Sequence, residues 1–356
     1  MEKQKDMSGM LEMVPQGAFF VSDNTVCLVN QAARQLLIEP GTPIADLLDS
    51  TMEEYADFES GCLCLTLMLC GCPVQACVTR MDAADLFVID READQAELKA
   101  MALTAMSFRE PLSHIMNAKS HLLSAMEPEQ QQSAQSWIGQ MNRHINQMHR
   151  MVCNMTDAAQ YLSNSVPRMA YHDICAVLEE LFDRVALLTE QAGYHLTYRG
   201  PREAITCLIS IERLERAVYN ILSNAMKNSP AGGTIEATLT RKGSKLYLSI
   251  RDEGPSIPDH LLSNLYNRYR RQPGIEAQPF GMGLGMVLVR GTATAHGGTV
   301  LIDRPDDRGN RVTMSLTICN AEGQTLRSEV CSVDYAGEYD HALLELSDVL
   351  PPEFYI

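Results

Sequence analysis

Polar side chains at helical spacing mark the stretch AVYNILSNAMKNSP. Asn220, Asn224 and Lys227 lie four and three residues apart, so a helix would place all three on one face. Amide oxygens are suitable ligands for Mg²⁺, and a lysine ammonium is suited to phosphate. An asparagine-rich helix face is most often simply solvated, so this pattern indicates a metal and phosphate site only together with other motifs.

A second motif, RDEGPSIP, follows a predicted strand. Asp252 stands at the end of that strand, where its carboxylate can accept a hydrogen bond from an exocyclic amino group. Gly254 allows the backbone to approach a neighbour closely because it has no Cβ. Taken alone, an aspartate before glycine usually marks a turn.

A third motif, GMGLG, opens a predicted helix. It contains Gly281, Gly283, Leu284 and Gly285. The free N–H groups and the positive end of a helix can cradle phosphates there. A glycine repeat is a weak signal by itself, and the joint order and spacing of the three motifs is what favours a nucleotide site.

Together the three motifs resemble the N, G1 and G2 boxes of the histidine-kinase ATP-binding domain, and LYNRYRR at 265–271 resembles its F box. The resemblance covers residues 170–318. It implies a Bergerat-type α/β sandwich that binds ATP and Mg²⁺, with a lid over the nucleotide at 254–280. It places Asn224 and Asn220 on Mg²⁺, Lys227 near the phosphates and Asp252 on adenine. The implied ATP-binding residues are Asn220, Asn224, Lys227, Asp252, Gly254, Arg268, Gly281, Gly283, Leu284 and Gly285.

Departures from the family pattern narrow the branch. Asn228 stands where an aromatic residue is common and Ser256 where glycine is usual, but neither change removes a principal ligand. ATP hydrolases and serine kinases of this fold carry a glutamate base four residues before the metal-binding asparagine. Asn220 occupies that position here, so the histidine-kinase branch is favoured.

Two long helices are predicted ahead of this domain, within 93–163. Their apolar residues alternate at spacings of three and four, which is a heptad seam. A helical hairpin cannot bury two such seams alone, so a homodimer with a four-helix bundle is expected. The first seam, which Lys119 interrupts, and the second comprise Leu98, Met101, Ala105, Phe108, Leu112, Ile115, Leu122 and Met126, then Ile138, Met141, Ile145, Met148, Val152, Met155, Ala159 and Leu162.

The first helix resembles the family's dimerisation and phosphotransfer segment. AMSFREPL aligns without gaps to its usual H box, Ser-His-Glu-Leu-Arg-Thr-Pro-Leu, and Met106 then occupies the phosphoacceptor position. Ser107 replaces the acidic neighbour, and Glu110 replaces the Thr or Asn that positions water in the family. With Ala105 at heptad position a, Met106 falls at b and faces outward.

His114 is an alternative acceptor. It also lies outside the seam, at position c, but about 12 Å farther along the helix and roughly 80° around it from Met106. A histidine at such a position is usually only solvated, so the substituted H box favours lost or impaired autophosphorylation.

Residues 10–90 read as short strands and helices that end in an antiparallel sheet. The opening MVPQGAFFVSDNTVCLVNQAARQLL resembles the start of a PAS sensor domain. Cysteines cluster between 62 and 77, which raises a metal or redox site as an alternative. They contain no CxxC pair, so small buried hydrophobic residues are favoured. The clustered residues are Cys62, Cys64, Cys70, Cys72 and Cys77.

Composition limits the possible partners. The chain of 356 residues has a formal charge of −16, which disfavours nucleic acid and anionic membranes. It lacks an apolar run of membrane-spanning length and a signal-peptide h-region, so a cytoplasmic location with reduced thiols is expected.

These patterns predict a multidomain α+β chain. A PAS-like sensor domain (1–92) precedes the dimeric helical hairpin (93–166), the ATP-binding domain (167–319) and an acidic tail (320–356) of unassigned function. We expect a two-component histidine-kinase homologue that binds Mg·ATP and signals by conformation or by recruiting a response regulator or another histidine kinase. The alternatives are an active kinase that uses His114 or a histidine on a partner chain, and a cysteine-based sensor.

Overall fold

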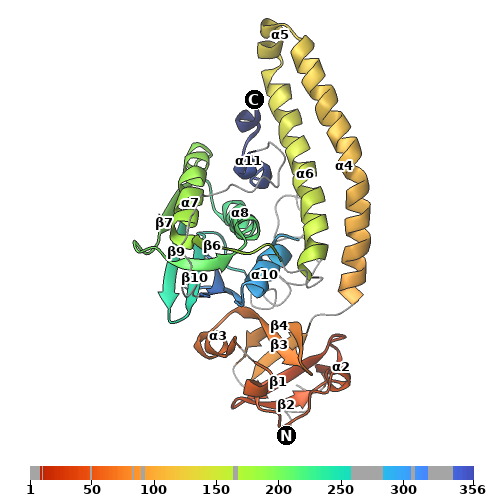
Figure 1. Cartoon of the computed structure of the whole chain (residues 1–356), viewed down its shortest axis with the longest axis vertical. Helices are drawn as coiled ribbons and strands as arrows, with labels where there is room; N and C mark the ends of the chain where they lie inside the picture. Colours follow the sequence, from red (N-terminus) through yellow and green to blue (C-terminus); the bar gives the residue numbers. More distant parts are fainter. Residues whose placement is uncertain are drawn as a thin grey trace.

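The computed structural model describes residues 9, 11–48, 50–81, 84–89, 93–162, 167–257, 284–305, 309–319 and 340–356. The N-terminal unit lies at one end of the molecule, a pair of long helices extends away from it, and an α/β unit lies beside the base of those helices (Figure 1). The Arg268, Gly281 and Gly283 positions and most of the expected lid fall outside the described residues.

The N-terminal unit is an antiparallel sheet with short helices between its second and third strands. Its strands run in the order β2-β1-β5-β4-β3. Asn30 is buried at the start of α2, where its Oδ1 accepts hydrogen bonds from the N–H groups of Ala33 and Ala18. The elements are β1 (Ala18–Ser22), β2 (Thr25–Val29), α2 (Gln31–Gln35), the 3-10 helix η1 (Ile44–Asp46), α3 (Met52–Asp57), β3 (Cys62–Leu69), β4 (Cys72–Arg80) and β5 (Asp85–Ile89).

Two long helices, α4 (Ala93–Ala125) and α6 (Gln135–Leu162), lie side by side (Figure 1). Ala105 and Leu112 are buried, whereas other members of the expected seam, including Phe108, are more than half exposed. The connection between them contains a short helix, α5 (Pro128–Ser133). The Gln130 side chain accepts from the Glu127 N–H there, which caps the helix start.

The third unit is a mixed α/β sandwich, as expected from the ATP-binding motifs. Its strands run in the order β11-β12-β10-β9-β7, with β7 parallel to β9 and the other pairs antiparallel. A separate pair, β6 and β8, stands beside this sheet. The elements are β6 (Ala170–Asp173), α7 (Ile174–Gln191), β7 (His195–Arg199), β8 (Thr206–Ile209), α8 (Ile211–Asn228), β9 (Thr234–Lys242), β10 (Lys245–Arg251), α10 (Gly285–Ala295), β11 (Val300–Asp303) and β12 (Arg311–Thr317).

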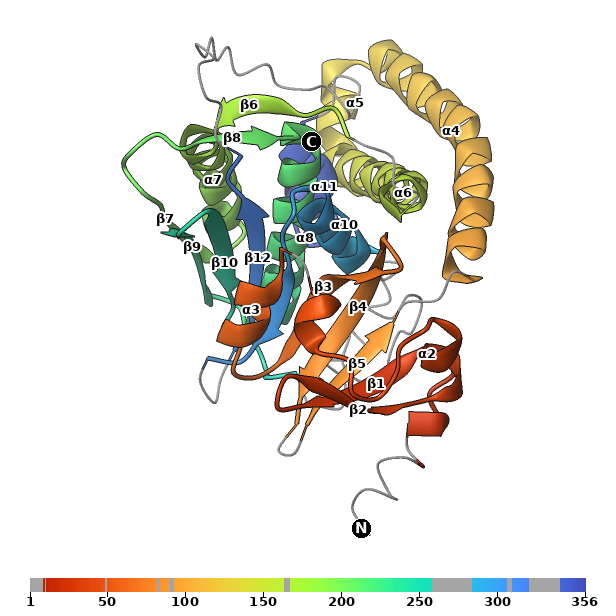
Figure 2. The same cartoon turned by 60° about the horizontal axis from the view of Figure 1, so that its bottom comes forward.

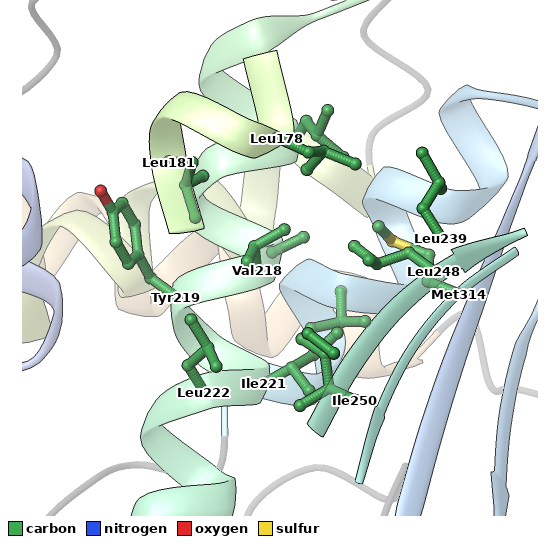
Figure 3. Packing of buried hydrophobic residues seen from close by; sticks show 14 of the residues in the cluster. Leu178, Leu181, Val218, Tyr219, Ile221, Leu222, Leu239, Leu248, Ile250 and Met314 are labelled. Atoms are coloured by element: carbon green, nitrogen blue, oxygen red, sulfur yellow. The ribbon is translucent and has the colours of Figure 1, made fainter. Parts of the chain in front are cut away.

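Helices α7 and α8 cover one face of this sheet (Figure 3). Alternate residues of β10 are buried beneath the helices because a strand turns successive side chains to opposite faces. The apolar face of α8 packs against these β10 residues. This packing determines where the opposite, polar face of α8 lies with respect to the C-terminal end of β10. The residues that form this contact include Leu178, Leu181, Val218, Ile221, Leu222, Leu246, Leu248 and Ile250.

A junction joins the two sheets. Strand β3 pairs antiparallel with β11, through Cys64 and Val300 among other residues, so ten strands form one continuous sheet. Gly61 lies at this junction with φ +95°, and a Cβ there would stand 2.2 Å from the Ile302 carbonyl oxygen. The buried Lys245 ammonium also donates to the Glu54 carboxylate of α3.

The C-terminal segment, residues 340–356, packs alongside α6 (Figure 1). It contains α11 (His341–Glu345) and the 3-10 helix η2 (Pro352–Tyr355). The stretch HALLELSDVL therefore begins as a helix, which ends at Glu345. Several of its apolar side chains are completely buried, including Leu344, Leu346 and Leu350, so this part of the acidic tail belongs to the folded protein.

Among the described residues, no helix is both long enough and apolar enough to span a bilayer.

Candidate nucleotide-binding site

The three residues of the first motif lie on helix α8 and become more exposed toward the C-terminal end of the helix. Asn220 is 3% exposed, Asn224 is half-buried and Lys227 is exposed in the last turn. The helix ends before Pro230, which disfavours a helical residue ahead of it. A lysine in this last turn also interacts favourably with the helix dipole. The predicted polar face of α8 is therefore present, and Lys227 lies at its solvent-exposed end.

The Asn220 amide is already engaged by other groups. Its Oδ1 accepts from Arg150 Nη2 of α6 at 3.1 Å, and its Nδ2 donates to the Arg216 carbonyl at 2.8 Å. The Asn224 amide makes no hydrogen bond with another residue in the described part of the chain. Asn224 is therefore open to the expected Mg²⁺, whereas Asn220 Oδ1 already accepts from the Arg150 guanidinium, whose positive charge opposes a cation at the same oxygen.

Asp252 lies just past β10 and is 5% exposed. Its Oδ1 accepts from the Gly254 N–H at 2.8 Å and from the Asn310 side-chain amide at 3.1 Å. Burial raises the pKa of this carboxyl above its ordinary value, and these N–H groups oppose the shift. Because the hydrogen bonds from Gly254 and Asn310 all end on Oδ1, Oδ2 remains as an acceptor for an amino group.

The two glycine positions within the described residues explain how the motifs come together. A Cβ at Gly254 would stand 2.4 Å from the Asn228 carbonyl oxygen at the end of α8. A Cβ at Gly285 would stand 2.8 Å from Asn220 Oδ1. Gly254 was expected to allow a close backbone approach, and the neighbour that it approaches is the backbone at the end of α8. All three motifs therefore converge on one face of α8.

Helix α10 begins at Gly285, with the buried Leu284 as its N-cap residue. This confirms a helix at the end of the GMGLG motif. Leu284 also packs in an apolar cluster with Val287 and Leu288 against Ala158 of α6. The start of α10 is thereby fixed against both α8 and the helical hairpin.

Sequence reasoning missed Asn310, which is 2% exposed. Its Oδ1 accepts from the Ile257 N–H, and its Nδ2 donates to Asp252 and to the Pro255 carbonyl. It therefore shapes the loop that carries Asp252. A single asparagine before a strand gives no sequence signal of this role.

Sequence reasoning also missed a charged network beside α8. Lys227 Nζ donates to Asp348 Oδ2 at 2.9 Å, and Arg150 Nη1 donates to the same oxygen at 2.8 Å. Asp348 is 121 residues away from Lys227 in sequence, so no spacing rule could pair them.

The residues of the substituted H box face outward on α4. Met106 is 54% exposed. The Ser107 hydroxyl donates to the Thr104 carbonyl at 2.6 Å, within its own helix. His114 Nε2 lies 3.8 Å from Glu110 Oε1, and both side chains are largely exposed. The structure therefore places these four residues on the solvent side of the hairpin, away from the nucleotide motifs on α8.

The cysteine cluster divides into two groups. Cys62, Cys64 and Cys77 are buried in the core, whereas Cys70 and Cys72 are exposed in and beside the turn between β3 and β4. Cys64 and Cys77 are register partners across β3 and β4, and their sulfurs lie 2.6 Å apart. Within the described ranges, no group of three or more His, Cys, Asp or Glu side chains is arranged to hold a metal ion.

Comparisons with known proteins show which family this part of the chain is similar to. Residues 209–319 match the family described as "Histidine kinase-, DNA gyrase B-, and HSP90-like ATPase". Histidine kinase P4 of Formosa agariphila is 24% identical over 250 residues, which cover 68% of this chain and 18% of that protein. Sensor histidine kinase CusS of Escherichia coli strain K12 is 27% identical over 217 residues, which cover 60% of this chain and 44% of CusS.

Among solved structures, full-length ShkA in complex with AMPPNP shares the fold with a TM-score of 0.51 at 18% identity, over 63% of this chain and 47% of ShkA. The chain thus spans less than half the length of these relatives. Residues 209–319 belong to the histidine kinase-like ATPase family, and the chain is a homologue of the sensor histidine kinases.

Proposed function

We propose that this chain binds Mg·ATP on the face of α8 where the three motifs converge. The observation that carries the proposal is the contact of Gly254 and Gly285 with the two ends of the Asn220 to Asn228 stretch, which brings Asp252 and the start of α10 to one site. The homology of residues 209–319 to an ATPase family supports it.

Each side chain has a distinct task in this proposal. Asp252 Oδ2 accepts from the exocyclic amino group of adenine. Lys227 and the N–H groups at the start of α10 interact with phosphate oxygens. Asn224, with Asn220, holds Mg²⁺, which supplies positive charge to the phosphates when it is bound.

The chain's own autophosphorylation is lost or impaired in this proposal. A thioether at Met106 has no N–H to exchange for a phosphoryl group. The Ser107 hydroxyl donates to the Thr104 carbonyl, so the residue after Met106 supplies no carboxylate to assist proton removal, and the Glu110 carboxylate lies beside His114. Signalling then proceeds by conformation or by recruitment of a response regulator or another histidine kinase, in the cytoplasm.

The remaining units fit a sensor arrangement. The strand, turn, strand and Asn-capped helix of the N-terminal unit support a PAS-like input domain. Exposed apolar residues along α4, such as Phe108 and Leu122, support a homodimer through the hairpin, because large apolar patches commonly mark interfaces.

Incubation with γ-labelled ATP and Mg²⁺ tests this function. We expect saturable nucleotide binding without a stoichiometric acid-labile label on the chain. A label that disappears in His114→Ala and persists in the matched exposed variant His121→Ala would establish an active kinase that uses His114. A label transferred to an added histidine-kinase partner would favour phosphorylation in trans.

One observation favours a second candidate function, a thiol sensor at the junction of the two sheets. The paired Cys64 and Cys77 sulfurs lie beside Arg290 of α10, whose Nη1 is 3.8 Å from Cys77 Sγ. We propose that a peroxide oxidises this pair. The two thiols lose two protons and two electrons to form one disulfide, and hydrogen peroxide becomes two waters.

Burial raises the pKa of the Cys64 thiol, so this oxidation is slow until the junction opens. Mass spectrometry of peroxide-treated protein, with alkylation before and after reduction, tests it. A reversible Cys64–Cys77 crosslink that is absent in Cys64→Ser supports the sensor. Oxidation confined to the exposed Cys70 and Cys72 would remove this candidate.

A further inference from the structure

The C-terminal segment lies in the angle between α6 and α8, beside the nucleotide motifs (Figures 1 and 2). It reaches this place from a distant part of the sequence and makes contacts with both helices. Two of its carboxylates, Glu345 and Asp348, form ion pairs with side chains of these two helices.

Asp348 engages the rim of the site directly. Its Oδ2 accepts from Lys227 and Arg150, and its side chain is only 11% exposed. Arg150 in turn donates to Asn220 Oδ1. The expected phosphate ligand and one expected metal ligand are therefore both held by a network that includes this carboxylate.

Glu345 holds the segment against α6 and α8. It is 0% exposed, and its two oxygens accept from Arg150 Nε at 3.1 Å and Arg216 Nε at 3.0 Å. A buried carboxylate is costly unless it is paired and hydrogen-bonded. Two guanidinium partners meet that requirement, so the segment docks in a specific position.

Helix α6 also binds the backbone of the segment. The Ser347 carbonyl accepts from Arg143 at 3.1 Å and from Gln147 at 3.0 Å, and the Tyr355 carbonyl accepts from Asn142 at 2.6 Å. These contacts do not depend on the nucleotide residues, so the segment has a binding surface of its own on α6.

We propose that the C-terminal segment is a displaceable intramolecular ligand of the nucleotide site, with Asp348 taking the place at Lys227 that ATP phosphates require. The inference rests on the proposed Mg·ATP function. The single positive charge of Lys227 cannot pair fully with both the Asp348 carboxylate and an ATP phosphate. An Asp348 carboxylate left beside the phosphates would also repel them. A cation at Asn220 Oδ1 is likewise opposed by the Arg150 guanidinium, which pairs with Asp348 and donates to that oxygen. Nucleotide binding and full docking of the segment therefore oppose each other.

Titration of full-length protein with AMPPNP in excess Mg²⁺ tests the proposal by calorimetry. Asp348→Asn keeps the size of the side chain but removes its charge, and we expect it to bind about 5-fold tighter or more than the wild type. Glu353→Gln removes an exposed carboxylate from the same segment and should leave the affinity unchanged. Equal or weaker binding by Asp348→Asn overturns the inference, because Asp348 would then be neutral or would position Lys227 productively.

Hydrogen exchange of the wild-type protein gives a second readout that needs no variant. Amides of residues 340–356 should exchange faster when the site is saturated with Mg·AMPPNP, and unchanged protection contradicts displacement. If neither the wild type nor Asp348→Asn binds nucleotide, the proposed function fails and the inference falls with it. If the wild type binds and both readouts stay unchanged, only the inference fails.

Discussion

Asp252 joins the end of β10 to the proposed adenine position. Three N–H groups, from Gly254 and from the backbone and side chain of Asn310, converge on its Oδ1. They fix the orientation of the carboxylate and leave Oδ2 to meet the ligand. Recognition of an amino group then depends on a single acceptor atom.

The Asp252→Asn variant should therefore lose nucleotide affinity. If Oδ1 keeps its three donors, the new amide nitrogen faces the adenine amino group, so two donors oppose each other. We expect binding of Mg·AMPPNP to weaken about 10-fold or more, by calorimetry. Glu236→Gln, an exposed charge loss on β9, is the control. Unchanged affinity in Asp252→Asn would place the adenine elsewhere.

His296 makes the same unit sensitive to acid. Its Nε2 accepts from the Ser210 N–H at 3.0 Å, and its Nδ1–H donates to the Thr292 carbonyl. Burial lowers the pKa of this imidazole below its usual value. The folded state thus binds fewer protons than the unfolded state as the pH falls below about 6.5, so stability declines over that range.

We expect His296→Gln to flatten this decline. Thermal unfolding of the wild type between pH 7.5 and 5.5, values chosen to bracket the usual histidine pKa, should lose up to about 1.4 kcal/mol per pH unit from this residue. The variant should start less stable but change less with pH. His121→Gln, on the outer face of α4, should retain the wild-type slope. Parallel slopes for wild type and His296→Gln would contradict the assignment.

At the scale of elements, the β3–β11 pairing links the N-terminal sheet to the ATPase unit. The link requires Gly61, where the backbone is left-handed and the Ile302 carbonyl lies against the missing side chain. Gly71 has a similar φ of +79°, but a Cβ there would meet nothing within 4 Å. A side chain at Gly61 would therefore cause both backbone strain and a steric clash, whereas a side chain at Gly71 would cause backbone strain alone.

We expect Gly61→Ala to open the junction, whereas Gly71→Ala should cost only backbone strain of about 1 kcal/mol. Limited proteolysis should release the N-terminal unit from Gly61→Ala faster than from Gly71→Ala. Calorimetry should also separate the unfolding of the two units only in Gly61→Ala. Matching digestion patterns for the two variants would show that the junction does not depend on this close approach.

For the whole molecule, the exposed seam of α4 is a row of apolar side chains that nothing in the described part of the chain covers. Phe108, Ile115 and Leu122 are 53%, 47% and 58% exposed and recur every seven residues. Ala105 and Leu112, the alternate seam positions, already pack within the hairpin. A second copy of the hairpin would cover the exposed row and complete a four-helix bundle.

Replacing both Phe108 and Ile115 with glutamate should convert the protein to a monomer in sedimentation velocity, because paired carboxylates would be buried in the interface. Leu103→Glu, at an exposed position outside the seam, should leave the assembly unchanged. A wild-type protein that sediments as a monomer at micromolar concentration would contradict the dimer directly.

The sequence by itself determined the local elements and the chemistry of the nucleotide motifs. Heptad spacing predicted α4 and α6, a strand was predicted ahead of Asp252 where β10 is found, and the order of the Asn, Asp and Gly motifs indicated that they share one site. These signals are local because helix and strand periods and motif spacings are written within short stretches of chain. The short helix α5 was not predicted, because its residues, PEQQQS, are all polar apart from the first and show no apolar periodicity.

Only the tertiary structure decided how the units are joined. The β3–β11 pairing uses backbone N–H and C=O groups, which nearly every residue carries, so side-chain patterns do not specify the partner strand. The docking of Glu345 and Asp348 joins charges more than a hundred residues apart in sequence, and its stability depends on burial that no local pattern records. Those long-range contacts place the C-terminal segment beside the motifs of the proposed nucleotide site, which is why its proposed control of access could not be read from the sequence.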